Sequence, residues 1–334
     1  MTAKLQLLES EFRAASVDLH QLQQALEQTI VGQRQLIVEL ITAVFAGGHI
    51  LLEGLPGLGK THLVKALAAA MGMGMARVQC TPDLMPSDIT GSEILLTDQQ
   101  GRQQLDFRRG PIFSNLVLVD EINRATPKTQ AALLEAMQES QVTHAGELHR
   151  LPHPFWVLAT QNPIEIEGTY PLPEAQMDRF LAQINVAYPD TDALLQLLDI
   201  SLDDEPSEHL EPVFDQARVE QIMALIRRVV IARPLKQAAV DLVLATHPGN
   251  RPASPLADRH FRYGASPRGL QALLRAARVR AVLEGRAHVD LEDIHRIALP
   301  VLRHRVLLNI ESELEGISMD RTLLEILELW RSAH

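Results

Sequence analysis

The sequence predicts an α/β fold, in which a parallel five-stranded β-sheet lies between layers of helices and is followed by a small all-helical domain. Three observations point to this class. Short apolar runs alternate with helical patterns between residues 49 and 186, and this order produces parallel sheets. A glycine-rich turn joins the first apolar run to a helix, and beyond Pro189 the apolar residues keep a helical spacing alone. We therefore expect two domains, over residues 1–189 and 190–334.

Length and composition fit a folded protein of this size. The chain has 334 residues, of which 46% are apolar and 22% charged, which is ordinary for a soluble globular protein. Its single cysteine, Cys80, excludes an internal disulfide and favours the reducing cytoplasm. The most apolar stretch, 36–52, is interrupted by Glu39 and by glycines, so we expect no membrane span. The net charge of −11 disfavours free nucleic acid as a partner.

The elements of the first domain follow from apolar periodicity and from glycine and proline positions. The expected strands cover residues 49–53, 76–80, 116–120, 155–160 and 181–186. The expected helices cover residues 17–28, 33–46, 60–71 and 127–139. The last of these helices has proline in its first turn, where the missing N–H has no helical partner to lose.

Two segments interrupt the alternation, and both have the pattern of a β-hairpin. The first covers residues 93–110 with a turn at 97–101, and the second covers residues 141–151. After Pro189 only helices are expected, over residues 191–201, 215–231, 234–246, 267–284 and 290–308. The loop 247–266 is long enough to suggest a functional or mobile segment.

The glycine-rich turn carries the most specific chemical signal. Gly54 to Thr61 reads G-x-x-x-x-G-K-T between a predicted strand and a helix, which is the context that a phosphate-binding loop requires. Its glycines let backbone N–H groups face phosphates, and the helix N-terminus adds its positive end. Lys60 is expected to reach the β- and γ-phosphates, and the Thr61 hydroxyl to bind Mg²⁺. The other residues of this segment that are predicted to bind ATP are Pro56, Gly57, Leu58, Gly59 and His62.

Polar residues at the ends of two later strands complete a candidate site. Asp120 and Glu121 follow a purely apolar run. We assign Asp120 to the magnesium ion together with Thr61, and Glu121 to the polarisation of the attacking water. Asn162 follows the fourth strand, where its amide can orient that water or sense the γ-phosphate. No Cys/His spacing typical of a transition-metal site is present.

The sequence closely resembles the MoxR family of AAA+ ATPases, from about residue 30 to residue 305. The matching stretches are GGHILLEGLPGLGKT (47–61), RVQCTPDLMPSDITG (77–91), GPIFSNLVLVDEINRATPKTQAALLEAMQES (110–140), PFWVLATQNPIEIEGTYPLPEAQMDRF (154–180) and GASPRGLQALLRAARVRA (264–281). The resemblance implies a P-loop AAA+ αβα core with a helical lid, and assembly into a ring, usually a hexamer, with ATP between neighbours. It also implies that the two hairpins are the helix-2 insert and the hairpin before sensor I, which in related motors face the pore or the substrate.

The resemblance also implies roles for residues that no local pattern assigns. Ile30, Val31 and Gly32 match the segment that lies against adenine, and Asn162 matches sensor I. Arg179 resembles the arginine finger that a neighbouring subunit inserts at the γ-phosphate. Arg268 matches sensor II and would act either on its own nucleotide or on a neighbour's. Arg305 also matches a recurrent family position, for which helix capping and nucleotide contact are both open.

The function that the resemblance implies is mechanochemical. ATP hydrolysis would drive the remodelling, maturation or metal-cofactor loading of a protein client. Relatives frequently work with a partner that bears a von Willebrand factor A domain, and this chain has no D-x-S-x-S run of its own, so a separate partner is expected. The first alternative is a chelatase-type motor that inserts a metal into a tetrapyrrole-like cofactor. A nucleic-acid motor is disfavoured by the acidic charge, and a GTPase by the lack of an Asn-Lys-x-Asp motif.

Overall fold

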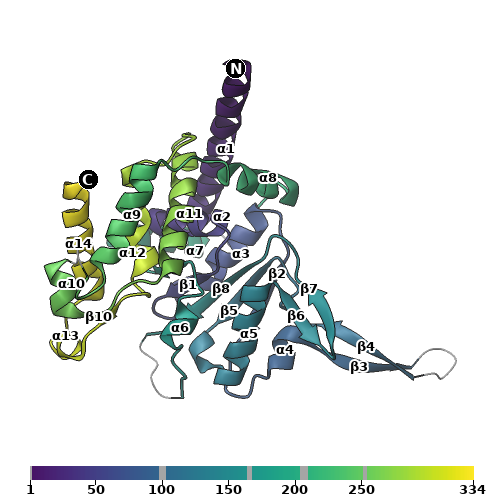
Figure 1. Ribbon diagram of the computed structural model, residues 1–334. Helices are drawn as coiled ribbons and strands as arrows, with labels where there is room; N and C mark the ends of the chain where they lie inside the picture. Colours follow the sequence, from purple (N-terminus) through teal and green to yellow (C-terminus); the bar gives the residue numbers. More distant parts are fainter. Residues whose placement is uncertain (1, 98–102, 164–167, 204–209, 251–253) are drawn as a thin grey trace.

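A five-stranded parallel sheet forms the centre of the molecule (Figure 1). The computed structural model describes residues 2–97, 103–163, 168–203, 210–250 and 254–334. The strands run in the order β2-β5-β8-β1-β9, with the bounds β1 (Ile50–Glu53), β2 (Met75–Gln79), β5 (Leu116–Asp120), β8 (Trp156–Gln161) and β9 (Ala182–Asn185). Every pair in this sheet is parallel, which confirms the predicted α/β class.

Alternate residues of the central strands face two separate apolar layers. Leu116 and Leu118 of β5 pack in one cluster with helices α1 (Thr2–Thr29), α2 (Arg34–Phe45) and α3 (Lys60–Ala70). Val117 and Val119 pack in a second cluster with helix α5 (Pro127–Glu139). Both faces of β5 are therefore buried, and this explains why its sequence is a continuous apolar run rather than an alternating one.

Helix α1 is longer than predicted because its apolar residues continue in steps of three and four towards the amino terminus. Phe12, Leu19, Leu22 and Leu26 are buried along one side. The helix packs against α3 and against α11 (Pro267–Leu283), and its first turns extend beyond the rest of the molecule (Figure 1). Among the described residues, no helix combines the length and apolarity needed to cross a bilayer.

Both predicted hairpins are present and project from the sheet domain (Figure 1). Strands β3 (Gly91–Thr97) and β4 (Gln103–Arg109) are antiparallel, as are β6 (Gln141–His144) and β7 (Glu147–Arg150). The turn expected at 97–101 lies outside the described residues except for Thr97. A short helix, α4 (Pro86–Thr90), precedes the first hairpin.

The region after Pro189 is mostly helical, but the expectation of helices alone is wrong. Strands β10 (Phe261–Tyr263) and β11 (Leu307–Leu308) form a small antiparallel sheet. The helix expected to reach residue 308 ends at Leu302, and β10 lies in the segment expected to be a long loop. Strands of two or three residues are too short to produce a periodic signal in the sequence. The other helices are α7 (Thr191–Asp203), α8 (Gln216–Ile226), α9 (Arg233–Ala245), α10 (Pro255–His260), α12 (Leu291–Leu302), α13 (Ile310–Leu314) and α14 (Met319–Ala333).

Candidate functional site

The phosphate loop connects the carboxyl end of β1 to the first turn of α3. Gly57 and Gly59 have φ values of +82° and +75°, which side chains of L-residues rarely adopt. A Cβ built at either position would meet no atom within 4 Å, so the space above the loop is open to a ligand. Lys60 Nζ lies across the loop, where it donates a hydrogen bond to Gly54 O at 2.6 Å. The loop thus has the glycine conformations and the cation that a triphosphate requires.

Asp120 ends β5 beside this loop and is almost completely buried. Its Oδ2 accepts a hydrogen bond from Thr61 Oγ1 at 3.5 Å, and its Oδ1 accepts one from Thr160 Oγ1 at 3.3 Å. Arg77, on the neighbouring strand β2, also donates from Nε to Asp120 Oδ2 at 2.7 Å. The carboxylate assigned to the metal therefore lies next to the hydroxyl assigned to it, and an arginine balances its charge.

Glu121 follows in a left-handed conformation, with φ of 56°, which is strained for a residue with a side chain. Its N–H donates to Thr160 Oγ1 at 2.8 Å. The side-chain oxygen Oε2 accepts from Gln79 Nε2 at 3.1 Å and from Arg124 Nη1 at 3.0 Å. These contacts hold the carboxylate at the edge of the sheet that carries the phosphate loop.

Asn162 is buried at the end of β8, and β8 lies between β1 and β5 in the sheet. The structure therefore brings the phosphate loop, Asp120, Glu121 and Asn162 to the same edge, as the strand pattern predicted.

The oxygen atoms at this edge fit a magnesium ion. Thr61 and Asp120 supply a hydroxyl and a carboxylate, which are hard ligands of the kind Mg²⁺ prefers. Within the described part of the chain, no group of three or more His, Cys, Asp or Glu residues is placed to hold a metal. A magnesium ion here would take its remaining ligands from phosphate and water, as Mg²⁺ usually does in nucleotide sites.

Cys80 lies directly behind the acidic pair, and its N–H donates to Asp120 O at 2.9 Å. Burial, together with the nearby Asp120 and Glu121, raises the pKa of the Cys80 thiol to about 12. The thiol therefore stays protonated near neutral pH and packs as a small apolar group.

The segment expected to contact adenine, residues 30–32, links α1 to α2. Ile30 packs against the large apolar cluster. Gly32 lies so close to Ala193, in the first turn of α7, that a Cβ at this position would be 2.3 Å from the Ala193 Cβ. This link therefore joins the two parts of the chain.

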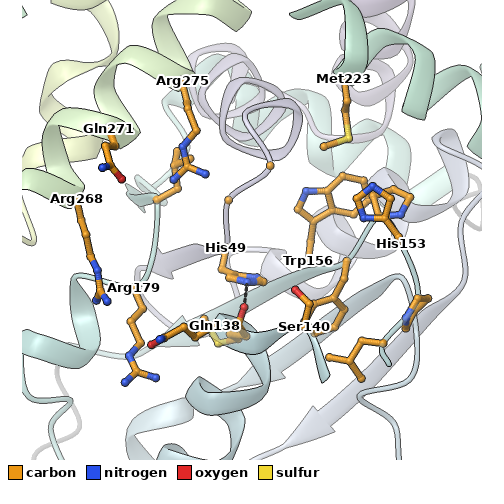
Figure 2. Close-up of a pocket in the computed structure, with 18 of the residues that line it drawn as sticks. His49, Gln138, Ser140, His153, Trp156, Arg179, Met223, Arg268, Gln271 and Arg275 are labelled. Atoms are coloured by element: carbon orange, nitrogen blue, oxygen red, sulfur yellow. Dashed lines mark hydrogen bonds between the residues drawn. The ribbon is translucent and has the colours of Figure 1, made fainter. Parts of the chain in front are cut away.

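Arg179 and Arg268 lie at the opposite edge of the sheet from the phosphate loop. Both line a cavity of about 690 Å³ together with residues 47–49, which precede β1, and residues 153–156, which lead into the start of β8. Figure 2 shows both arginines at this cavity. Because the strands are parallel and each is about 13–20 Å long, neither side chain can reach the phosphate loop of its own chain.

A hydrogen-bonded cluster around Asp178, the residue before Arg179, holds the start of helix α11, which carries Arg268. Ser266 Oγ caps α11 by accepting from Arg268 N at 3.1 Å, and it donates to Asp178 Oδ1 at 2.8 Å. Arg305 Nε donates to Asp178 Oδ1 at 2.8 Å. A Cβ at Gly269 would be 2.9 Å from Arg305 Cδ, so this close approach requires glycine.

The guanidinium group of Arg305 makes all of its observed hydrogen bonds within the protein. Its guanidinium also donates to the backbone oxygens of Leu181, Phe180 and Val301, the last of these in the final turn of α12. Burial lowers the pKa of Arg305 to about 10, although Asp178 opposes this change. Of the two roles left open by the sequence, the contacts favour helix capping and attachment of the helical region to the sheet.

The sequence patterns assigned no role to Arg77, Gln79 or Arg275. Arg77 and Gln79 alternate along β2 and so share the face that reaches Asp120 and Glu121, a signal that becomes visible once β5 is placed beside β2. Arg275 lines the cavity with Arg179 and Arg268. Its only signal was its spacing of seven residues from Arg268.

Comparisons with known proteins match this architecture. A model of the ATPase family associated with various cellular activities (AAA) matches residues 49–182, and one of the AAA lid domain matches residues 254–326. The chain is similar to the YeaC protein of Bacillus subtilis, with 41% identity over 90% of this chain and 91% of that protein. It is 37% identical to the chaperone MoxR1 of Mycobacterium tuberculosis, over 94% of this chain and 82% of that one. A crystal structure from Cytophaga hutchinsonii, described as a candidate ATPase, has a TM-score of 0.88 at 38% identity and covers 97% of this chain and 98% of its own.

Proposed function

Because the chain belongs to the AAA ATPase family, in its MoxR group, and is an ATP hydrolase, we propose that it is the motor subunit of a ring that remodels or matures a protein client. The observation that supports this proposal most directly is the position of Arg179 and Arg268 at the sheet edge away from the phosphate loop. In a ring, that edge of one subunit faces the nucleotide of the next. The family is typically oligomeric, and a hexamer is the proposed assembly.

The proposed reaction divides its work between two subunits. One subunit binds ATP and Mg²⁺ through Lys60, Thr61 and Asp120, while Glu121 accepts a hydrogen bond from the attacking water and Asn162 orients it. Magnesium, when bound, balances the phosphate charge. The neighbouring subunit supplies Arg179 and Arg268, whose guanidinium groups contact the phosphoryl oxygens as negative charge is redistributed in the transition state.

The exposed hairpins are the proposed contact with the client. Leu95 and Leu96 of β3 and Leu105 of β4 are 56%, 46% and 60% exposed, so the β3–β4 hairpin presents apolar side chains to the solvent. Exposed apolar surface of this kind is typical of protein-binding sites. The MoxR1 relative is named a chaperone, which is consistent with a protein client. We propose that a separate protein with a von Willebrand factor A domain recruits that client.

Two substitutions test the assigned chemistry. Glu121→Gln is expected to keep ATP affinity within about twofold and to lower kcat by about 10²–10⁴-fold, the range typical of a lost general base. Lys60→Ala is expected to abolish nucleotide binding. Glu315→Gln, at an exposed glutamate outside the site, is the matched control and should keep parental hydrolysis. If Glu121→Gln turns over ATP at the parental rate, the assignment of Glu121 is wrong.

The client-binding part of the proposal requires a separate measurement. The Glu121→Gln variant should retain a client and a von Willebrand factor A protein in the presence of ATP, and Lys60→Ala should retain neither. Recovery of tetrapyrrole-metabolising enzymes alone would contradict the remodelling function and favour a chelatase-type motor instead.

A further inference from the structure

The cavity at the amino-terminal edge of the sheet contains more positive charge than the two assigned arginines supply. Six arginines line it, at positions 150, 179, 227, 268, 275 and 305. Asp178 is the one carboxylate among its described lining residues. That carboxylate already accepts hydrogen bonds from Arg305 and from Ser266. The cavity is therefore strongly cationic in a chain whose net charge is −11.

Arg275 is an arginine of this set to which the sequence patterns assigned no role. Arg268, Gln271 and Arg275 are spaced by three and four residues on α11 and so lie on the same helix face. Figure 2 shows all three side chains extending from this helix into the cavity, with Arg179 opposite them. Within the described residues, no hydrogen bond or ion pair holds the Arg275 guanidinium, whereas Arg305 is fully engaged and Arg179 donates to Leu134 O at 2.8 Å.

The positive charge around Arg275 favours an anionic ligand in the cavity. The surrounding protein atoms remove part of its water and lower its pKa, and no nearby carboxylate opposes the change. Its charge in turn contributes to the lowered pKa of His49 and of Arg305. Arg275 is exposed to solvent in the open cavity, so its five N–H donors are available to a ligand. An anion in the cavity would accept hydrogen bonds from these donors.

We propose that Arg275 contacts the triphosphate of the nucleotide bound by the neighbouring subunit, as a third arginine beside Arg179 and Arg268. This inference rests on the proposed function, in which that edge of the subunit faces a neighbour's nucleotide. A triphosphate fits better than a carboxylate because its several charged oxygens accept hydrogen bonds from more than one guanidinium group at once. Arg275 reaches the ligand from the same helix face as Arg268 and therefore moves with it.

The test uses the full chain with Arg275→Ala, Arg275→Gln and Arg275→Lys. Arg275→Ala and Arg275→Gln are expected to lower kcat at least about tenfold, with nucleotide affinity unchanged because each chain's own phosphate loop is intact. Arg275→Lys should recover only part of the rate, since an ammonium group lacks the planar fork of arginine. The control is Arg233→Ala, an exposed arginine in the first turn of α9 outside the cavity, which should keep parental hydrolysis and assembly.

Mixed assemblies show whether Arg275 acts across the subunit interface. An equal mixture of Arg275→Ala and Lys60→Ala chains contains interfaces with an intact phosphate loop from the first chain and intact arginines from the second. Hydrolysis by the mixture should exceed the sum of the two separate preparations. Parental kcat in Arg275→Ala and Arg275→Gln, or a loss that the Lys60→Ala chain does not restore, would overturn the inference.

Two other results separate this inference from its premise. If Arg275→Ala weakens assembly while each assembled ring hydrolyses ATP at the parental rate, Arg275 pairs with a carboxylate of the neighbour, and the inference is wrong while the proposed function stands. If Arg179→Ala also hydrolyses ATP at the parental rate, the proposed division of the site between subunits fails, and the inference fails with it.

Discussion

Burial holds the imidazole of His49 neutral beside the arginine-lined cavity, and two backbone contacts fix its tautomer. The Val157 N–H, which can only donate, lies 3.0 Å from Nδ1, so Nδ1 carries no proton. The ring therefore donates from Nε2 to Met137 O at 3.0 Å, the contact drawn in Figure 2. Burial is the largest cause that lowers the pKa of His49 to about 4, and Arg275 adds to it.

This arrangement predicts a loss of stability in mild acid. Between pH 6.5 and pH 4 the unfolded chain binds a proton at His49 that the folded chain does not, so the free energy of unfolding falls as the pH falls through this range. The lowered pKa corresponds to about 3 kcal/mol at most. His304, whose pKa burial lowers as well, contributes in the same direction. Urea unfolding at pH 7, 6 and 5 measures the slope.

The control for this prediction is His49→Gln, whose amide can accept from Val157 and donate to Met137 without titrating. Its free energy of unfolding should fall less steeply between pH 6.5 and pH 4 than that of the parent, by up to one proton. Identical slopes in the two proteins would show that His49 does not contribute to the acid sensitivity.

At the scale of elements, the two hairpins are joined by one aromatic side chain. Phe107 of β4 stacks on His149 of β7 with ring centroids 4.3 Å apart and on His144 of β6 at 4.9 Å. It also meets Phe113 edge-on at 6.0 Å. These contacts couple the β3–β4 hairpin to the β6–β7 hairpin, which precedes β8 and Asn162 in the chain.

We expect Phe107→Ala to uncouple the hairpins without disturbing the sheet. Aromatic pairs contribute about 0.5–1.5 kcal/mol each beyond their buried area, so amide exchange in residues 141–150 should accelerate on the order of fivefold or more. Exchange in β5 and β8 should not change. Leu105→Ala, at an exposed position of the same strand, is the matched control. Equal exchange in the two variants would rule out coupling through Phe107.

At the scale of the whole molecule, the two groups of candidate residues lie on opposite edges of one sheet. The proposed function therefore makes hydrolysis a property of the assembly rather than of the single chain. Arg179→Ala should lose activity by about 10³–10⁵-fold, as arginine-finger enzymes do. An equal mixture with Lys60→Ala chains should recover part of it, measured as phosphate release per protomer. The absence of recovery at every mixing ratio would mean that Arg179 does not act on a neighbour's nucleotide.

The local sequence pattern was sufficient to predict the position of the candidate residues that directly follow a strand. The phosphate loop, the Asp120–Glu121 pair and Asn162 each follow an apolar strand, and parallel strands bring their carboxyl ends to one edge wherever they lie in the sheet. The sheet class and both hairpins were likewise predicted from patterns of neighbouring residues along the chain. The short strands β10 and β11 were missed because their pairing is made by contacts between distant segments, not by periodicity.

The sequence by itself determined which residues are the candidates to bind phosphate and metal, because glycine conformation, strand ends and helix starts are set by neighbouring residues along the chain. Only the tertiary structure decided how their charges are balanced and where the other arginines lie. Arg77 meets Asp120 only because β2 is placed beside β5. Arg268 and Arg275 share a cavity with Arg179 only because Ser266 and Arg305 attach the helical region to Asp178. Such contacts depend on how helices pack against a sheet, and side chains distant in sequence carry no local signal of that packing.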